Sequence, residues 1–129
     1  MPIRIKYIIP FPFDTEGIAN RAAQIPHEVL GPDTVVECVP VRNSITNLDS
    51  YYEATLLDAY ITEAGLLSEK EGFDAVCMDT VSDSGLYALR SQLSIPVIGP
   101  GLVSYCVASM LAKKFSIITM WDKWRHLYE

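Results

Sequence analysis

The sequence has 129 residues, of which 50% are hydrophobic and 20% charged, and its formal net charge is -6. These are the proportions of one ordinary globular domain, and the acidic excess disfavours nucleic acid and anionic membrane surfaces as partners, because both require clustered Lys and Arg. The three cysteines lack CxxC spacing and no segment resembles a signal peptide or a membrane span, so we expect a cytoplasmic protein with no metal site and no disulfide framework.

The first third of the chain predicts a strand, a helix and a second strand. The strands are expected over residues 3–9 and 34–40. Between them, a helix is predicted to begin near Asp14 or Thr15, since either side chain can cap it. One face of this helix is predicted to carry Ile18, Ala22, Ile25 and Val29. This order is typical of the βαβ unit of a parallel sheet.

The middle of the chain repeats the same alternation. A second helix is expected to open at Ser50, because Ser50 and Glu53 have the spacing of a capping box, and Gly72 is expected to stop it. A third strand is predicted over residues 74–78 and a third helix over about 84–93. The second helix is expected to bury Tyr52, Leu56, Ala59, Leu66 and Leu67, and the third Leu86, Leu89 and Leu93.

The last third adds a strand over residues 95–99, a helix over about 102–112 and a fifth strand over 115–119. The 102–112 helix is apolar nearly all round, which predicts burial on both sides. A terminal helix capped by Asp122 would present an uncovered stripe, so a homo-oligomer or a further segment of chain is expected to cover it. That stripe comprises Trp121, Trp124 and Tyr128. Together the elements predict an α/β fold, a doubly wound open parallel sheet with helices on both faces.

Polar loops are expected to meet at one edge of this sheet. In open α/β sheets, ligands bind beyond the carboxyl ends of the strands. Residues 10–14, 79–84, 99–101 and 119–122 all follow predicted strands. Free N–H groups at the starts of the third and fourth helices would favour a carboxylate or a polarised carbonyl there. Taken singly, Ser82 or Asp83 is equally well explained as a simple helix cap.

The stretch EGFDAVCMDTVSDSGLYALRSQLSIPVIGPGLVSYCVASMLAKKFSIIT, together with SYYEATLLDAY upstream, resembles the aspartate/glutamate/hydantoin racemase superfamily. It is most similar to the hydantoin and allantoin racemase branch, in which a strand ending in cysteine is followed by a short turn and a helix. The resemblance implies one half of a two-domain racemase-like architecture. Residues 1–100 would form the first α/β domain, and residues 101–129 would be the incomplete start of the second.

The same resemblance implies proton transfer, without a cofactor, at a carbon next to a carbonyl of a small hydantoin, ureide, amino acid or carboxylate. Two half-domains would each supply one cysteine, one removing a proton and the other returning it. A thiol with a lowered pKa can do this near neutral pH, while backbone donors hold the enolate oxygen.

The sequence departs from this pattern at three places. Thr80 occupies the position of the first-half cysteine, and a Thr hydroxyl is far too weak an acid to be a resting base. The turn PFPF at residues 10–13 replaces an Asn-Pro-Asn turn. The second cysteine belongs to a half that these 129 residues lack. Cys77 and Cys106 are interpreted as small buried hydrophobes.

The sequence thus assigns the catalytic position to Thr80, in a racemase-like isomerase. Three alternatives stay open: a catalytically impaired protein that binds small anions, a decarboxylase-type relative, and a purely structural fragment. The residues expected to bind substrate are Pro12, Phe13, Asp79, Val81, Ser82, Asp83, Gly99 and Thr119.

Overall fold

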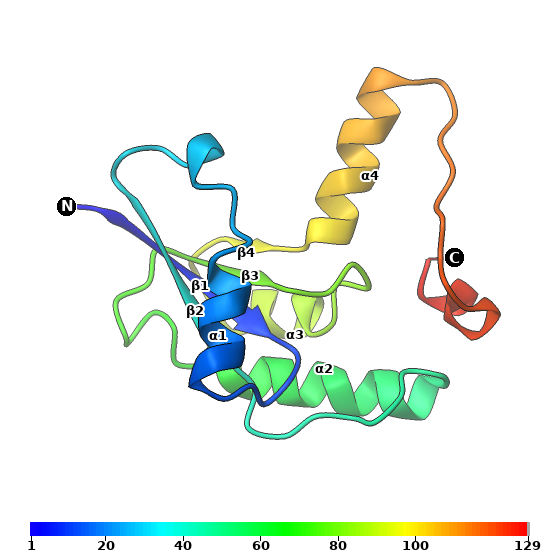
Figure 1. The fold of residues 1–129 in the computed structure, drawn as a ribbon, viewed down its shortest axis with the longest axis horizontal. Coiled ribbons are helices and arrows are strands. Elements are labelled where there is room, and N and C mark those ends of the chain that lie inside the picture. The colour runs from blue at the N-terminus through cyan, green and yellow to red at the C-terminus, as the bar shows by residue number, and fades with distance from the viewer. Residues whose placement is uncertain (129) are drawn as a thin grey trace.

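A computed structural model describes residues 1–128 and shows a four-stranded parallel sheet with strand order β2-β1-β3-β4 (Figure 1). The strands are β1 (Ile3–Ile9), β2 (Thr34–Pro40), β3 (Ala75–Met78) and β4 (Val97–Ile98). The helices are α1 (Thr15–Ala22), α2 (Tyr51–Gly65), α3 (Leu86–Arg90) and α4 (Pro100–Leu111), with 3-10 helices η1 (His27–Val29) and η2 (Asp122–Leu127). The predicted α/β parallel fold is therefore confirmed.

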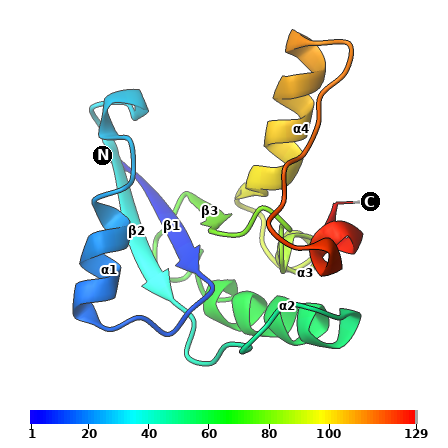
Figure 2. The ribbon, with the colours of Figure 1, turned by 45° about the vertical axis from the view of Figure 1, so that its right-hand side comes forward.

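The main hydrophobic core lies between the sheet and the α2/α3 layer. Ile8 of β1 and Val76 of β3 are fully buried against Ile61 of α2 and Leu89 of α3. Side chains alternate along a strand, so Tyr7 and Cys77 face the opposite side, where α1 lies. Figure 2 shows α1 separated from α2 and α3 by the sheet.

Helix α1 is shorter than predicted. It begins at Thr15, and the Asp14 carboxylate accepts a hydrogen bond from the Gly17 N–H at 2.8 Å, which confirms Asp14 as the cap. The helix ends at Ala22, so the predicted extension of its apolar face is wrong, and Val29 lies in η1 with 74% of its surface exposed. Pro26 explains the early end, because a proline disfavours helical conformation in the residue before it.

The buried face of α2 also differs from the prediction. Leu57, Ile61 and Gly65 are buried, whereas Tyr52 is exposed. The observed face follows the close approach of α2 to α3: a Cβ at Gly65 would lie 2.6 Å from a methyl carbon of Leu89. The capping box is incomplete, because the Ser50 hydroxyl bonds the Glu53 carboxylate instead of a helix N–H.

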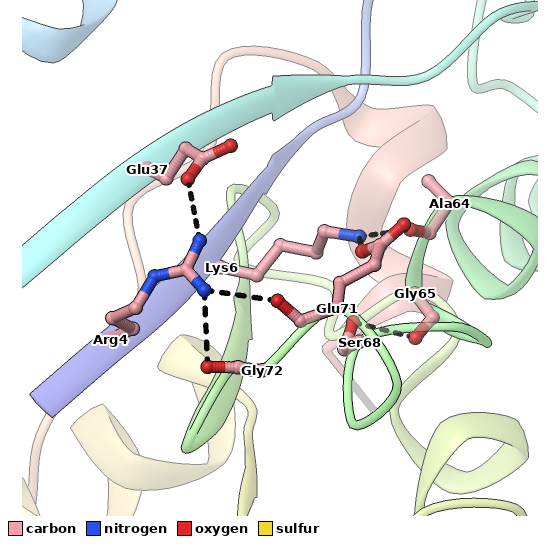
Figure 3. A network of polar contacts seen from close by, with 8 residues as sticks. All are labelled: Arg4, Lys6, Glu37, Ala64, Gly65, Ser68, Glu71 and Gly72. Atoms are coloured by element: carbon pink, nitrogen blue, oxygen red, sulfur yellow. Dashed lines mark hydrogen bonds and ion pairs between the residues drawn. The ribbon is translucent and has the colours of Figure 1, made fainter.

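Two cations of β1 hold the loop that follows α2 (Figure 3). Arg4 donates to the carbonyl oxygens of Glu71, at 2.9 Å, and Gly72, at 3.2 Å. The Lys6 ammonium is buried, donates to the Ala64 carbonyl at 3.0 Å and pairs with the Glu71 carboxylate. These contacts lie at the amino end of the sheet's central strands and leave the carboxyl edge free for a ligand.

The region after β3 is less regular than predicted. Helix α3 has five residues and β4 only two, although Leu86 and Leu89 are buried as expected. Helix α4 projects away from the layers (Figure 1). The predicted burial of α4 on both sides is wrong, since Gly101 is its one buried residue and Leu111 is 82% exposed. No helix within residues 1–128 is long and apolar enough to cross a membrane.

The predicted fifth strand over residues 115–119 is wrong. The segment carries no strand assignment, and Ile118 is 97% exposed. Helix α4 carries this segment away from the β4 edge, where a fifth strand would have to pair. The final turn is η2, whose N-cap is Trp121 and not Asp122. Glu129, the last residue of the predicted second domain, lies outside the described residues.

Candidate active site

A pocket of about 410 Å³ opens at the carboxyl edge of the sheet. The loops after β1, β2 and β3 form three of its sides, and the aromatic residues of the C-terminal segment form the fourth. Four of the predicted site residues line it: Asp79, Thr80, Val81 and Ser82. The predicted terminal stripe also lines this pocket, so Trp121, Trp124 and Tyr128 pack toward their own chain.

The Thr80 side chain is oriented by the loop that it begins. Its Oγ1 atom accepts a hydrogen bond from the Ser84 N–H at 3.1 Å, and its carbonyl oxygen accepts one from the Asp83 N–H at 3.1 Å. The hydroxyl proton has no acceptor within residues 1–128. Thr80 can therefore donate a hydrogen bond to a ligand oxygen.

Two backbone donors stand beside this hydroxyl. The N–H groups of Val81 and Ser82 donate no hydrogen bond to any other residue that the structure describes, and both residues line the pocket. The Ser82 hydroxyl lies 3.1 Å from that of Ser84. Successive free N–H groups in a turn form a concave site for an anion or a polarised oxygen.

The starts of α3 and α4, in contrast, are already satisfied. The Asp83 carboxylate accepts from the N–H groups of Gly101 at 2.8 Å and Leu102 at 2.7 Å, so Asp83 caps α4. Asp58 accepts from the Gly85 N–H at 2.8 Å, and burial raises the pKa of this carboxyl although that bond acts in the other direction. The prediction that these helix starts present free donors is therefore wrong for these three N–H groups.

Asp79 is held in an ion pair behind the loop. Arg21 of α1 donates to both carboxylate oxygens at 2.5 Å, and the Tyr7 hydroxyl donates to one of them at 2.6 Å. Burial, reinforced by the bond to Asp79, raises the pKa of Tyr7 above its usual range. The hydrogen bonds that Arg21 donates to Asp79 likewise raise the pKa of Arg21. Asp79 thus adds little net charge to the pocket and fixes the end of β3.

The remaining predicted site residues lie elsewhere. Phe13 lines a neighbouring cavity with Arg21 and stacks on Phe11 at a centroid distance of 5.7 Å, while Phe11 itself reaches the main pocket. Pro12, Gly99 and Thr119 do not line the main pocket. Gly99 instead allows the close approach of Asp83, because a Cβ there would lie 2.7 Å from the Asp83 carboxyl carbon.

The sequence reasoning missed the loop after β2. Residues Ser44, Ile45, Thr46, Asn47 and Leu48 all line the pocket. The signal was available, because β2 is parallel to β1 and its carboxyl end must reach the same edge. The Ser44 hydroxyl donates to the Pro10 carbonyl at 2.6 Å, which joins this loop to the one after β1.

None of the three cysteines lines the pocket. Cys77 lines a cavity on the α1 side of the sheet, and burial raises the pKa of its thiol to about 11. Burial also raises the pKa of Cys38, while Cys106 is exposed on α4, contrary to its predicted burial. In the part of the chain that the structure describes, no group of three His, Cys, Asp or Glu side chains could hold a metal ion.

Two solved structures share this fold over nearly the whole chain. The fold matches allantoin racemase from Klebsiella pneumoniae with a TM-score of 0.84 at 22% identity, over 98% of this chain and 51% of that one. Allantoin racemase from Pseudomonas fluorescens matches with a TM-score of 0.82 at 20% identity, over 98% of this chain and 52% of that one. A hydantoin racemase from Pseudomonas sp. (strain NS671) is 30% identical over 115 residues, which is 89% of this chain and 45% of that protein.

The chain is therefore a parallel α/β domain of the kind found in these two allantoin racemases. The model of the Asp/Glu/hydantoin racemase family matches residues 15–129, and the chain belongs to this family. It spans about half the length of the relatives that it matches.

Proposed function

We propose that this protein is a racemase-type isomerase that acts, without a cofactor, at a carbon next to a carbonyl of a small hydantoin or ureide. The observation that carries the proposal is the donor set at the end of β3. The Thr80 hydroxyl proton and the N–H groups of Val81 and Ser82 belong to three consecutive residues that line the pocket, and they have no partners among residues 1–128. Three adjacent donors suit the oxygen of an enolate as its charge develops.

In this proposal Thr80 is a hydrogen-bond donor and not the base. Its Oγ1 lone pair already accepts from Ser84, and no His or Lys side chain lines the pocket to activate it. The Cys77 thiol, with a pKa of about 11 and a place on the other side of the sheet, is unsuited to proton abstraction near pH 7. Asp79 is neutralised by Arg21.

We therefore assign the proton-transfer groups to a second racemase half. Residues 101–129 are proposed to begin that half, which comes either from further chain or from a partner copy in a cytoplasmic homo-oligomer. The apolar face that α4 exposes, with Met110 78% and Leu111 82% accessible, supports such pairing. The first half then binds the carbonyl oxygen and the second exchanges the proton.

Solvent deuterium exchange tests this function. We expect a 5-substituted hydantoin in D₂O at pH 7 to lose its proton at carbon 5, as followed by NMR, faster with the protein, its second half included, than in a protein-free blank. Thr80→Ala removes one oxyanion donor and should slow the exchange by about 100-fold to 1000-fold. Thr80→Ser keeps the donor and the bond to Ser84, and should retain most of the rate.

Two results would count against the proposal. Equal exchange by Thr80→Ala and the parent protein removes Thr80 from the mechanism. No acceleration over the blank with hydantoins, ureides, amino acids and small carboxylates rejects the isomerase function itself.

A further inference from the structure

The outer wall of the pocket is made by the last turn of the chain. We name residues 121–128 the aromatic lid, because Trp121, Trp124, Leu127 and Tyr128 all line the pocket from this turn. The two indole rings contact edge to face, with centroids 6.2 Å apart. The lining also includes the apolar side chains of Phe11, Ile45, Leu48 and Leu57. It thus combines a large apolar and aromatic part with the donors near Thr80.

The contacts between the lid and the domain include one ion pair and one ring contact. The Lys123 ammonium pairs with Asp49 at 3.0 Å, and the His126 ring meets the Tyr51 ring edge to face at 4.8 Å. The ion pair is largely exposed on the lysine side, and such pairs contribute only about 0 to 1 kcal/mol. The linker at residues 112–120 has no regular secondary structure and is exposed apart from Thr119. The lid is therefore joined to α4 by a long, exposed linker, in which Phe115 stacks on Tyr105, and its ion pair with Asp49 is a weak latch.

The closed position also leaves polar atoms buried without partners. Thr119 Oγ1, Trp124 Nε1 and His126 Nε2 are all inaccessible to water and lack a hydrogen-bond partner within residues 1–128. Tyr105 Oη, on the helix that precedes the linker, is in the same state. Leaving such a group unpaired disfavours a conformation substantially. The described structure thus combines an aromatic inner face with a docking that is easily reversed.

We propose, on the basis of the proposed function, that the aromatic lid determines specificity by closing over an apolar or aromatic substituent on the reacting carbon. The hydantoin ring places its carbonyl oxygen at Thr80, Val81 and Ser82. Its substituent then extends toward Trp121 and Trp124. A ureido substituent that lies against the indole faces would lose hydrogen bonds to water, which disfavours it. Contact with an apolar substituent would add apolar burial that holds the lid against the domain.

Two ligands with the same ring test this selectivity. 5-Benzylhydantoin and allantoin share the hydantoin ring and differ only in the substituent at carbon 5. The chain contains two Trp residues, both in the lid, so intrinsic tryptophan fluorescence reports on this turn alone. We expect 5-benzylhydantoin to bind at least 10-fold more tightly than allantoin and to protect the indoles from acrylamide quenching.

Variants separate the lid from the rest of the site. Trp124→Leu, read through Trp121, should reduce the preference for the benzyl compound to less than 3-fold, whereas Tyr87→Leu, on an exposed aromatic outside the pocket, should leave it unchanged. Asp49→Asn breaks the latch without altering the pocket lining, and should increase quenching in the free protein and weaken benzyl binding more than allantoin binding.

The outcomes distinguish this inference from the proposed function. Equal or reversed affinity for the two ligands, or a full preference retained in Trp124→Leu, overturns the role of the lid even if deuterium exchange is observed. Failure of both ligands to bind overturns the inference as well, and absence of deuterium exchange in the same samples rejects the isomerase function independently.

Discussion

Asp83 is expected to be a main attachment of α4 to the domain, beside the packing of Leu102 against the core. Gly101 is the one buried residue of this helix, and the Asp83 carboxylate accepts from two of its first N–H groups. Removing a capping side chain costs about 1 kcal/mol, and removing a negative charge from a helix start costs about 0.3 to 1 kcal/mol more. Asp83→Ala should therefore weaken the attachment of α4 by about 1.3 to 2 kcal/mol, which is roughly a 10-fold to 30-fold change in its opening equilibrium.

Hydrogen exchange with mass spectrometry measures this opening segment by segment. Amides of residues 101–111 should exchange 10-fold to 30-fold faster in Asp83→Ala, while those of β1 should keep their protection, because opening is local. Asp83 has φ of +55°, so alanine is also strained there, and Asp83→Gly should be less damaging than Asp83→Ala. Asp83→Asn keeps one acceptor and tolerates this backbone, so it should be the mildest. Unchanged protection of α4, or an equal loss across the whole chain, would refute this reasoning.

Three further substitutions test other parts of the structure. Arg21→Lys breaks the bidentate pair with Asp79 and should lower the urea midpoint by the equivalent of about 2 kcal/mol. Glu37→Gln removes a partner from an exposed pair and should change the free energy of unfolding by at most about 1 kcal/mol. Equal effects of the two substitutions would contradict the role given to burial. Gly65→Ala forces a methyl against Leu89 and should destabilise by about 1 to 3 kcal/mol in thermal unfolding, and an unchanged melting temperature would show that Leu89 moves aside. Burial raises the pKa of Cys77 from 9.0 to about 11, so between these pH values the folded chain keeps a proton that the unfolded chain releases. The free energy of unfolding is therefore unaffected by Cys77 below pH 9 and falls by about 3 kcal/mol as the pH rises to 11. Cys77→Ala should make this alkaline decline in stability less steep.

The sequence was sufficient for the order of elements as far as α4 and for the edge at which the site lies. Strand β1 was predicted at its observed bounds, and Leu86 and Leu89 were placed correctly in the core. Periodicity failed on α2, because which apolar residues are buried depends on the approach of α3, and Gly65, which permits that approach, carries no apolar signal of its own.

The site was predicted in part, for a physical reason. The loop after β3 follows from the rule that ligands bind beyond the carboxyl ends of parallel strands. The same rule applies to the loop after β2, which contains Ser44 to Leu48. The role of Asp83 could not be derived from local spacing, since its hydrogen bonds reach 18 and 19 residues along the chain. The place of Trp124 depends on a 3-10 turn folding back after an irregular linker, which no helical or strand period encodes.

The parallel pairing of β1 has a consequence for biosynthesis. Ile5 pairs with Val36 on one side and with Ala75 on the other. Strand β1 is therefore synthesised well before the strands with which it pairs. At ribosomal speeds of roughly 5 to 20 residues per second, the 70 residues from Ile5 to Ala75 take roughly 4 to 14 s to synthesise. Through that interval the nascent chain displays an apolar strand with an open edge, and pulse proteolysis of stalled ribosomal complexes should find it protected only after β3 has emerged.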